Sequence, residues 1–136
     1  MTNSSNPPPQ LIDELKQIVG SNRVSLDSND LETYGRDWTR VYAPAPSAVV
    51  FPGTTEEVAA LVRACAAHKV PIVPSGGRTG LSAGAVATNG EIVLSLDRLN
   101  FIEDPCPLAR TLKAGAGAIT AEVHAKAATV GLTWPV

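Results

Sequence analysis

The chain has 136 residues, of which 44% are hydrophobic and 18% charged, and its formal net charge is −2. A chain of this length forms one domain with room for a hydrophobic core. The near-neutral charge leaves no basic surface for a nucleic acid, and no apolar run approaches the roughly 20 residues that span a bilayer. We therefore expect no nucleic-acid partner and no transmembrane segment.

The N-terminal ten residues are rich in Asn, Ser and Pro and carry neither the basic nor the apolar region of a signal peptide. They predict a disordered lead-in over residues 1–9 and a cytoplasmic protein.

The next segment, Pro9–Val19, predicts an amphipathic helix with apolar residues at helical spacing. The two cysteines, Cys65 and Cys106, have neither the spacing of a disulfide framework nor that of a metal site.

Two short features follow the first helix. Val24–Leu26 predicts a short strand. The segment after it mixes polar and aromatic side chains, among them Tyr34, Asp37 and Trp38. Aromatic clusters usually pack in the protein interior, but a ligand-facing role for these three residues stays open.

A strand–helix–strand unit comes next. Ala48–Phe51 predicts an apolar strand that is buried on both faces. Thr54 and Glu57 form a capping box at the start of a helix that runs to about residue 68, and Val70–Val73 predicts the second strand. The unit has the size of a right-handed parallel crossover. We expect the buried stripe of its helix to consist of Val58, Leu61, Val62 and Cys65.

The glycine-rich segment after Val73 is the main candidate for a binding site. Residues 74–85 hold four of the eleven glycines of the chain. Glycine permits positive φ and a close approach of a ligand to the backbone, and successive N–H groups in such a loop form a concave anion site. No acidic residue occurs between Glu57 and Glu91, whereas Arg78 lies inside the segment. The pattern predicts a phosphate or pyrophosphate site.

Other interpretations of this segment fit less well. It lacks the Lys-Ser or Lys-Thr pair of a Walker A loop, and no helix follows it as in a dinucleotide fingerprint. Gly80–Gly84 matches the G-x-S-x-G pattern of hydrolases, with Asp97 or Asp104 and then His124 in the expected order. However, Ser82 lies in the middle of a loop and not at a sharp turn between a strand and a helix. A Ser82→Ala variant that retained catalysis would exclude a nucleophilic role.

The last third of the chain predicts two strands and a helix. The strands are Glu91–Leu96 and residues 108–114, the latter with alternating faces. Residues 115–117 form a glycine hinge or a near match to G-x-G-x-x-G, whose N–H groups could line the same ligand site. The helix covers Thr120–Val130, with Thr120 as its N-cap.

Together these segments resemble the N-terminal part of the FAD-binding domain of FAD-linked oxidases. This is the vanillyl-alcohol oxidase-like superfamily, in the branch of D-lactate, glycolate and D-2-hydroxyglutarate dehydrogenases. The resemblance rests on residues 48–58, 70–81 and 91–100, and on Gly131-Leu132 with Trp134-Pro135. It implies an α+β fold of the vanillyl-alcohol-oxidase type, whose first subdomain contains the strand–helix–strand unit and is incomplete here.

The resemblance also implies a cofactor and its site. FAD is expected to bind non-covalently, because the loop lacks the His that tethers the cofactor in flavinylated relatives. The backbone amides of Gly76–Gly80 would hold the pyrophosphate, Thr79 would add a hydroxyl, and Leu81 and Ser82 would lie nearer the isoalloxazine ring. The cofactor-binding residues implied in this way are Pro74, Ser75, Gly76, Gly77, Arg78, Thr79, Gly80, Leu81 and Ser82.

The implied reaction is hydride transfer from a D-2-hydroxy acid to FAD, which yields the 2-oxo acid. The residues that handle the substrate would lie beyond Val136, so the resemblance implies no catalytic residue in this chain. We expect residues 10–136 to be the N-terminal part of a truncated FAD-binding domain that turns over no substrate alone. A non-catalytic FAD-binding fragment or subunit, completed by a partner chain, stays open as the alternative.

Overall fold

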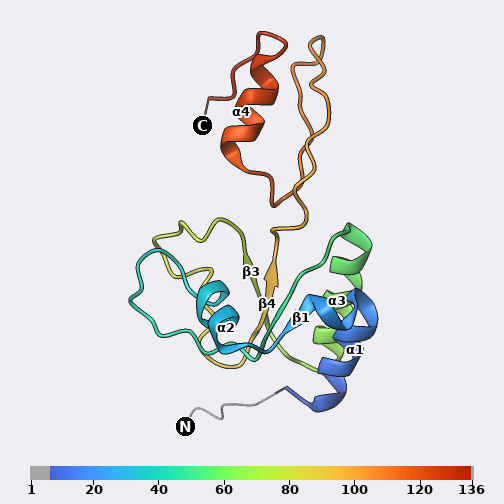
Figure 1. The fold of residues 1–136 in the computed structure, drawn as a ribbon, viewed down its shortest axis with the longest axis vertical. Helices are drawn as coiled ribbons and strands as arrows, with labels where there is room; N and C mark the ends of the chain where they lie inside the picture. Colours follow the sequence, from blue (N-terminus) through green and yellow to red (C-terminus); the bar gives the residue numbers. More distant parts are fainter. Residues whose placement is uncertain (1–6, 136) are drawn as a thin grey trace.

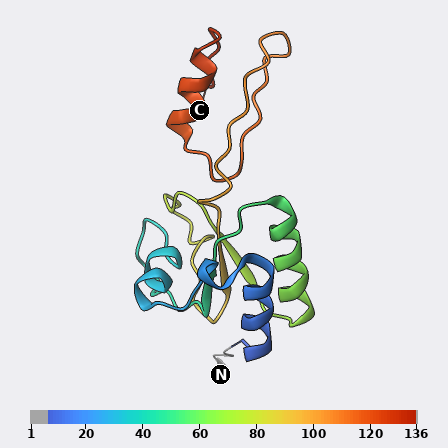
Figure 2. The ribbon, with the colours of Figure 1, turned by 45° about the vertical axis from the view of Figure 1, so that its right-hand side comes forward.

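The computed structural model describes residues 7–135 of the chain. A four-stranded sheet lies between α1 and α3 on one face and α2 on the other (Figure 1). Residues 101–135, here called the outer segment, lead away from the sheet and carry α4 (Figures 1 and 2). The helices are α1 (Pro9–Val19), the 3₁₀ turn η1 (Ser21–Arg23), α2 (Ser28–Tyr34), α3 (Thr55–Ala67) and α4 (Thr120–Ala128).

The sheet has the strand order β1-β2-β4-β3. Strand β1 is antiparallel to β2, and β4 is parallel to both β2 and β3. The predicted strand–helix–strand unit is therefore confirmed as a parallel unit, with β4 inserted between its two strands. The strands are β1 (Val24–Ser25), β2 (Ala48–Val50), β3 (Ile72–Ser75) and β4 (Ile92–Ser95).

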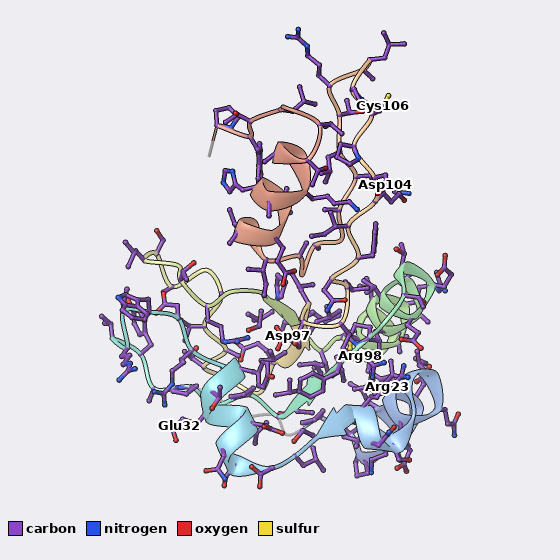
Figure 3. The ribbon with its side chains drawn as sticks, turned by 45° about the horizontal axis from the view of Figure 1, so that its top comes forward. Arg23, Glu32, Asp97, Arg98, Asp104 and Cys106 are labelled. Atoms are coloured by element: carbon purple, nitrogen blue, oxygen red, sulfur yellow. The ribbon has the colours of Figure 1, made fainter. Side chains whose placement is uncertain are left out.

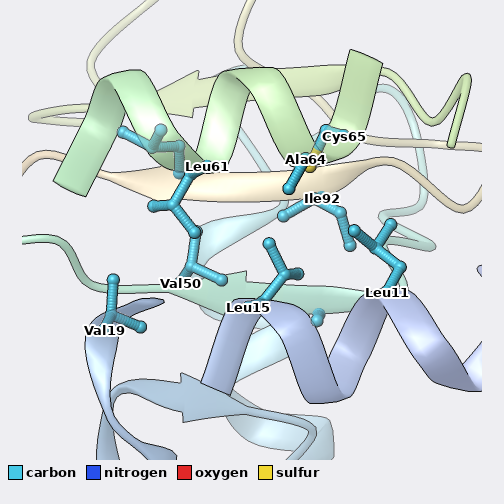
Figure 4. Close-up of a cluster of buried hydrophobic side chains, with 10 residues drawn as sticks. Leu11, Leu15, Val19, Val50, Leu61, Ala64, Cys65 and Ile92 are labelled. Carbon is cyan, nitrogen blue, oxygen red and sulfur yellow. The ribbon is translucent and has the colours of Figure 1, made fainter. Parts of the chain in front are cut away.

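The main core lies between the sheet and the helices α1 and α3 (Figure 4). All three residues of β2 are buried, as the continuous apolar run predicts. The predicted stripe of α3 is wrong at Val62, which is 47% exposed, whereas Ala64 is buried in its place. Successive helical residues turn by about 100°, so Val62 points away from the sheet when Leu61 and Cys65 face it. Burial raises the pKa of the Cys65 thiol to about 11, so the thiol keeps its proton at neutral pH.

Side-chain caps explain where two helices begin. The Thr54 hydroxyl accepts a hydrogen bond from the Glu57 N–H (3.1 Å), and the Glu57 carboxylate accepts one from the Gly53 N–H (2.6 Å). The predicted N-cap of α3 is thus confirmed. The sequence pattern predicts no helix at α2, which the Asp27 carboxylate caps by accepting from the N–H of Asn29 (2.9 Å).

Two predicted strands differ from the structure. The predicted strand Val70–Val73 lies at Ile72–Ser75 instead, because Val70 still completes the turn after α3, where its N–H donates to the Cys65 carbonyl. Residues 108–114 form no strand. They run antiparallel to residues 102–106 with only isolated bridges, at Ile102–Ala114 and Cys106–Thr111. No third strand in the described chain pairs with these two arms, so no regular ladder develops along them.

The helix of the outer segment is shorter than predicted. Helix α4 ends at Ala128 and begins after Ile119, which is its N-cap, so that Thr120 is the first helical residue and not the cap. The sheet and the elements before residue 101 are here called the sheet part. At Gly117 the chain returns to it, because the Gly117 N–H donates to the Leu99 carbonyl (2.9 Å). Within residues 7–135, no helix is long and apolar enough to cross a membrane.

Candidate cofactor site

The glycine-rich loop and the start of the outer segment face one cavity. Strands β3 and β4 pair in parallel, with Ser75 opposite Ser95, so the loops that leave their carboxyl ends lie side by side. The cavity between these loops and the start of α4 has a volume of about 700 Å³. Asp97 lies between the sheet and the outer segment in Figure 3. The lining residues are Gly76, Gly77, Arg78, Thr79, Asp97, Asn100, Ala116, Gly117, Ala118, Ile119, Thr120 and Glu122.

The glycines of the loop are not required by close packing within the described chain, and Gly77 and Gly80 are two examples. A Cβ at Gly77 would approach no atom closer than 3.9 Å, and a Cβ at Gly80 would meet nothing within 4 Å. Neither glycine has positive φ; Arg78 (φ 56°) and Ala83 (φ 59°) take the left-handed conformation instead. The expectation that glycine supplies positive φ in this loop is therefore wrong. The bare backbone at Gly77, which lines the cavity, fits a cofactor that approaches it closely.

The start of α4 contributes to the same cavity. Ile119 and Thr120 line it, and the N-terminus of α4 has no side-chain cap. The first N–H groups of a helix are free to bind an anion, and the helix dipole favours negative charge there. Gly117 lies in the cavity wall, but its N–H and that of Gly115 donate to the backbone carbonyls of residues 99 and 101, so the expectation that the N–H groups near residues 115–117 line the ligand site is not confirmed. The uncapped start of α4 is therefore the part of this wall that suits a pyrophosphate group.

The side chain of Arg78 is held by three neighbours. Its guanidinium lies 4.7 Å from the centroid of the Tyr34 ring. Its Nη1 atom donates to the Gly76 carbonyl (2.9 Å) and lies 3.6 Å from Oδ1 of Asp97. The Tyr34 hydroxyl donates to the other carboxylate oxygen of Asp97 (3.0 Å). Partial burial, followed by the hydrogen bond and charge of Asp97, raises the pKa of Tyr34, so the phenol keeps its proton and remains a donor.

Asp37 fixes the far end of the glycine-rich loop. This buried carboxylate accepts hydrogen bonds from the N–H and the hydroxyl of Thr39 (3.0 and 2.6 Å) and from the N–H of Ala83 (2.9 Å). The backbone N–H of Trp38 also donates to the Gly80 carbonyl (3.3 Å). The sequence leaves open whether Tyr34, Asp37 and Trp38 face a ligand. In the structure, Tyr34 and Asp37 support the loop, whereas the side chain of Trp38 is 68% exposed.

The predicted site residues separate into four groups. Gly76–Thr79 line the cavity, but Pro74 and Ser75 belong to β3, and the buried Oγ of Ser75 has no hydrogen-bond partner among the described residues. Leu81 and Ser82 lie beside Thr39 and Tyr42 in a separate depression of about 290 Å³. Gly80 lines neither of these two hollows. Of the nine predicted residues, the cavity therefore uses only the four at positions 76–79.

The expectation that no acidic side chain lies near the site is wrong in the folded structure. Asp97 and Glu122 both line the cavity. Asp97 reaches it because β4 lies next to β3, and Glu122 because the outer segment folds back over the strand ends. A stretch of sequence without acidic residues does not show which acidic side chains neighbouring strands bring close to it. The signal that could have found Asp97 is its place directly after a predicted strand.

The structure gives no support to a hydrolase site. Ser82 lies in a loop, with no helix directly after it. His124 lies on α4, where its ring stacks against Trp134 at 5.4 Å between centroids. Ser82 and His124 thus have different surroundings, and the strand–turn–helix context of a nucleophile elbow is missing at Ser82.

A glycine-lined anion cavity at the carboxyl ends of parallel strands is the arrangement of proteins that bind nucleotide cofactors. Residues 46–136 match the FAD binding domain family, and the chain belongs to this family, with FAD as its cofactor. This result confirms the FAD-linked oxidase resemblance.

Relatives identify the branch of the family. The chain is 52% identical over 128 residues to a D-2-hydroxyglutarate dehydrogenase of Stutzerimonas stutzeri (strain A1501), and the match covers 94% of this chain and 28% of the relative. It is 52% identical over 122 residues to a D-2-hydroxyglutarate dehydrogenase of Xanthomonas citri pv. viticola, covering 90% of this chain and 26% of the relative. The chain therefore spans just over a quarter of these relatives.

A solved structure supports the predicted fold. Alkyldihydroxyacetonephosphate synthase superimposes with a TM-score of 0.83 at 19% identity, and the match covers 98% of this chain and 27% of the other. At this identity the likeness concerns the fold alone. The prediction of a vanillyl-alcohol-oxidase-like FAD-binding fold, present in part, is confirmed.

Proposed function

We propose that the whole protein oxidises a D-2-hydroxy acid to the 2-oxo acid, with D-2-hydroxyglutarate as the first candidate and D-lactate and glycolate as the others. The support is the 52% identity to two D-2-hydroxyglutarate dehydrogenases. FAD, when bound, supplies the two-electron acceptor for such an oxidation. The chain described here binds and orients the cofactor, and the groups that contact the substrate are expected beyond it.

The observation that carries the proposed site is the bare backbone in the cavity wall. The N–H groups of Gly76–Thr79 hold the pyrophosphate of FAD, and the Thr79 hydroxyl adds a hydrogen bond. The nearest atom to a Cβ built at Gly77 is 3.9 Å away, so alanine fits there until a cofactor is present. Leu81 and Ser82 are assigned to the part of the site nearer the isoalloxazine ring. FAD binds without a covalent link, because no His lies in the loop.

The cofactor site is tested with a matched pair of glycine variants in the whole protein. Gly77→Ala places a methyl group in the cavity wall, whereas Gly84→Ala places one in open space in the same loop, away from the cavity. We expect Gly77→Ala to weaken FAD binding by about tenfold or more, with Gly84→Ala unchanged. Titration of the apoprotein by flavin fluorescence measures both, and equal affinities would contradict the proposed site.

The reaction is tested with both enantiomers of the substrate. The whole protein is expected to reduce a dye in the presence of D-2-hydroxyglutarate and to form 2-oxoglutarate, with little or no reaction of the L-enantiomer. Acid denaturation should release free FAD into the supernatant. A flavoprotein that reduces the dye with none of the D-2-hydroxy acids would favour the alternative, in which this chain is a non-catalytic FAD-binding part that a partner completes.

A further inference from the structure

We propose that Arg78 is a positioning residue that neutralises Asp97 and so lets the cavity accept the pyrophosphate of FAD. The inference rests on the cofactor site proposed above. Arg78 comes from the glycine-rich loop and Asp97 from the turn after β4, and both line the cavity. Nothing in the family match or in the named relatives assigns a role to either side chain.

The contacts of Asp97 account for both of its carboxylate oxygens. Oδ2 accepts the hydrogen bond of the Tyr34 hydroxyl at 3.0 Å, and Oδ1 lies 3.6 Å from Nη1 of Arg78. The same Nη1 donates to the Gly76 carbonyl, and the guanidinium stacks over the Tyr34 ring. Both oxygens of the Asp97 carboxylate thus have protein partners, a hydrogen-bond donor at Oδ2 and a cation at Oδ1.

The charges in the cavity wall show why this matters. The wall holds two carboxylates, Asp97 and Glu122, and Arg78 is the one cation among its lining residues. A pyrophosphate adds further negative charge, and its repulsion by a carboxylate grows as the surroundings lose water. Removal of Arg78 would leave Asp97 without its ion-pair partner, and the wall would hold two carboxylates and no cation beside the phosphates. The cation therefore makes an acidic wall compatible with an anionic cofactor.

The backbone at Arg78 supports a role for its side chain. Its φ of 56° lies in the left-handed region, which glycine adopts without the steric cost of a side chain. The loop already contains glycine on both sides, at Gly77 and Gly80, yet an arginine occupies the left-handed position. Arg78→Gly removes the side chain and relieves the backbone at once, so a loss of FAD affinity in this variant is not caused by backbone strain.

A direct contact between Arg78 and a phosphate is the competing explanation. The observed contacts favour charge compensation, because Nη1 is engaged by Gly76 and Asp97 and the guanidinium plane by Tyr34. The two explanations predict different results when the charge of Asp97 is also removed. Neutralising Asp97 restores binding if Arg78 acts on Asp97, and it does not if Arg78 acts on the phosphate.

The test compares FAD affinity in a double-mutant cycle of the whole apoprotein, measured by flavin fluorescence quenching. We expect Arg78→Gly to raise the Kd by about tenfold and Arg78→Lys, which keeps the charge, by about threefold or less. Asp97→Asn alone is expected to bind at least as tightly as the wild type. The double variant Arg78→Gly/Asp97→Asn should return to within about threefold of the wild type.

Two outcomes would overturn the inference. A double variant that binds FAD as weakly as Arg78→Gly shows that Arg78 acts on the cofactor, and an Arg78→Gly variant with wild-type affinity shows that it is not needed. Urea unfolding of each apoprotein separates these results from a loss of folding. The Gly77→Ala titration is independent: if it leaves FAD affinity unchanged, the proposed site itself is wrong, whatever the cycle shows.

Discussion

Asp37 has almost no contact with solvent, and it receives hydrogen bonds from the Thr39 hydroxyl and from the N–H groups of Thr39 and Ala83. It ties the segment before β2 to the end of the glycine-rich loop. The Thr39 hydroxyl, helped by the N–H of Ala83, holds the pKa of the Asp37 carboxyl below its ordinary value of 3.8. These hydrogen bonds need the charged form, because only the carboxylate accepts at both oxygens.

The lowered pKa of Asp37 predicts a specific pH dependence. A carboxyl with a depressed pKa in the folded state stabilises the protein fully above its unfolded value of 3.8, and this stability is lost as the pH falls through the folded pKa. We expect Asp37→Asn to be less stable than the wild type at pH 7, with the difference shrinking below pH 3.8. Circular dichroism during urea unfolding at several pH values measures it.

The control for Asp37 is Asp13→Asn, which changes an exposed carboxyl on α1. It should follow the wild-type pH profile. If Asp37→Asn also follows the wild-type profile, its carboxylate does not hold the loop in the way described.

At the level of elements, the outer segment meets the sheet part through a close backbone approach at Gly117. Its N–H donates to the Leu99 carbonyl, and a Cβ built on Gly117 would lie 1.8 Å from the Leu96 carbonyl oxygen. Gly115 has a similar restriction, with a Cβ 1.9 Å from the Leu99 carbonyl oxygen. The near match to G-x-G-x-x-G is therefore explained by the path of the chain, as the glycine hinge predicts.

Gly117→Ala should separate these two parts or shift the backbone at their junction. We expect a loss of about 3 kcal/mol in the free energy of unfolding, as for other overpacked sites. Gly84→Ala, with open space around its Cβ, should change stability by no more than about 0.5 kcal/mol. Urea unfolding of both variants checks this, and similar stabilities would show that the junction relaxes without cost.

Local patterns predict the elements whose evidence is local. Helix α1 follows from hydrophobic spacing, strand β2 from a continuous apolar run, and α3 from its Thr54 cap. Helix α2 escapes prediction because its seven residues are too short for a periodic stripe, and only the Asp27 cap marks it. Residues 108–114 alternate as a strand does, but alternation alone provides no neighbouring strand to pair with.

For the molecule as a whole, the cavity joins the sheet part to the outer segment, since Gly76–Thr79 and residues 116–120 both line it. The glycines of the loop are evident in the sequence, and so is their suitability for an anion. Asp97 and Glu122 could not be placed beside them, because their proximity follows from strand order and from the path of the outer segment. Sequence reasoning thus predicts the ligand chemistry of the loop but not the charges that face it.

A cofactor that occupies this cavity should hold the two parts together. Addition of FAD at about 100 times its Kd is expected to stabilise the folded whole protein by about 2.7 kcal/mol. Amide hydrogen exchange should slow both in residues 76–79 and at the start of α4, although these segments are distant in sequence. Protection confined to the loop would mean that the outer segment does not contact the cofactor. Gly77→Ala at the same FAD concentration serves as the control with reduced protection.

The position of β4 between β2 and β3 also determines when the site can form during synthesis. The ribosome releases β3 and the glycine-rich loop before β4, yet β3 has no sheet neighbour among the described strands other than β4. Pairings between segments that are separated in sequence form late, because closing the intervening loop costs entropy before the contact is made. The loop therefore lacks its supporting strand until β4 has emerged, and a cofactor held at the proposed site would bind only chains in which Asp97 and the start of α4 have also folded.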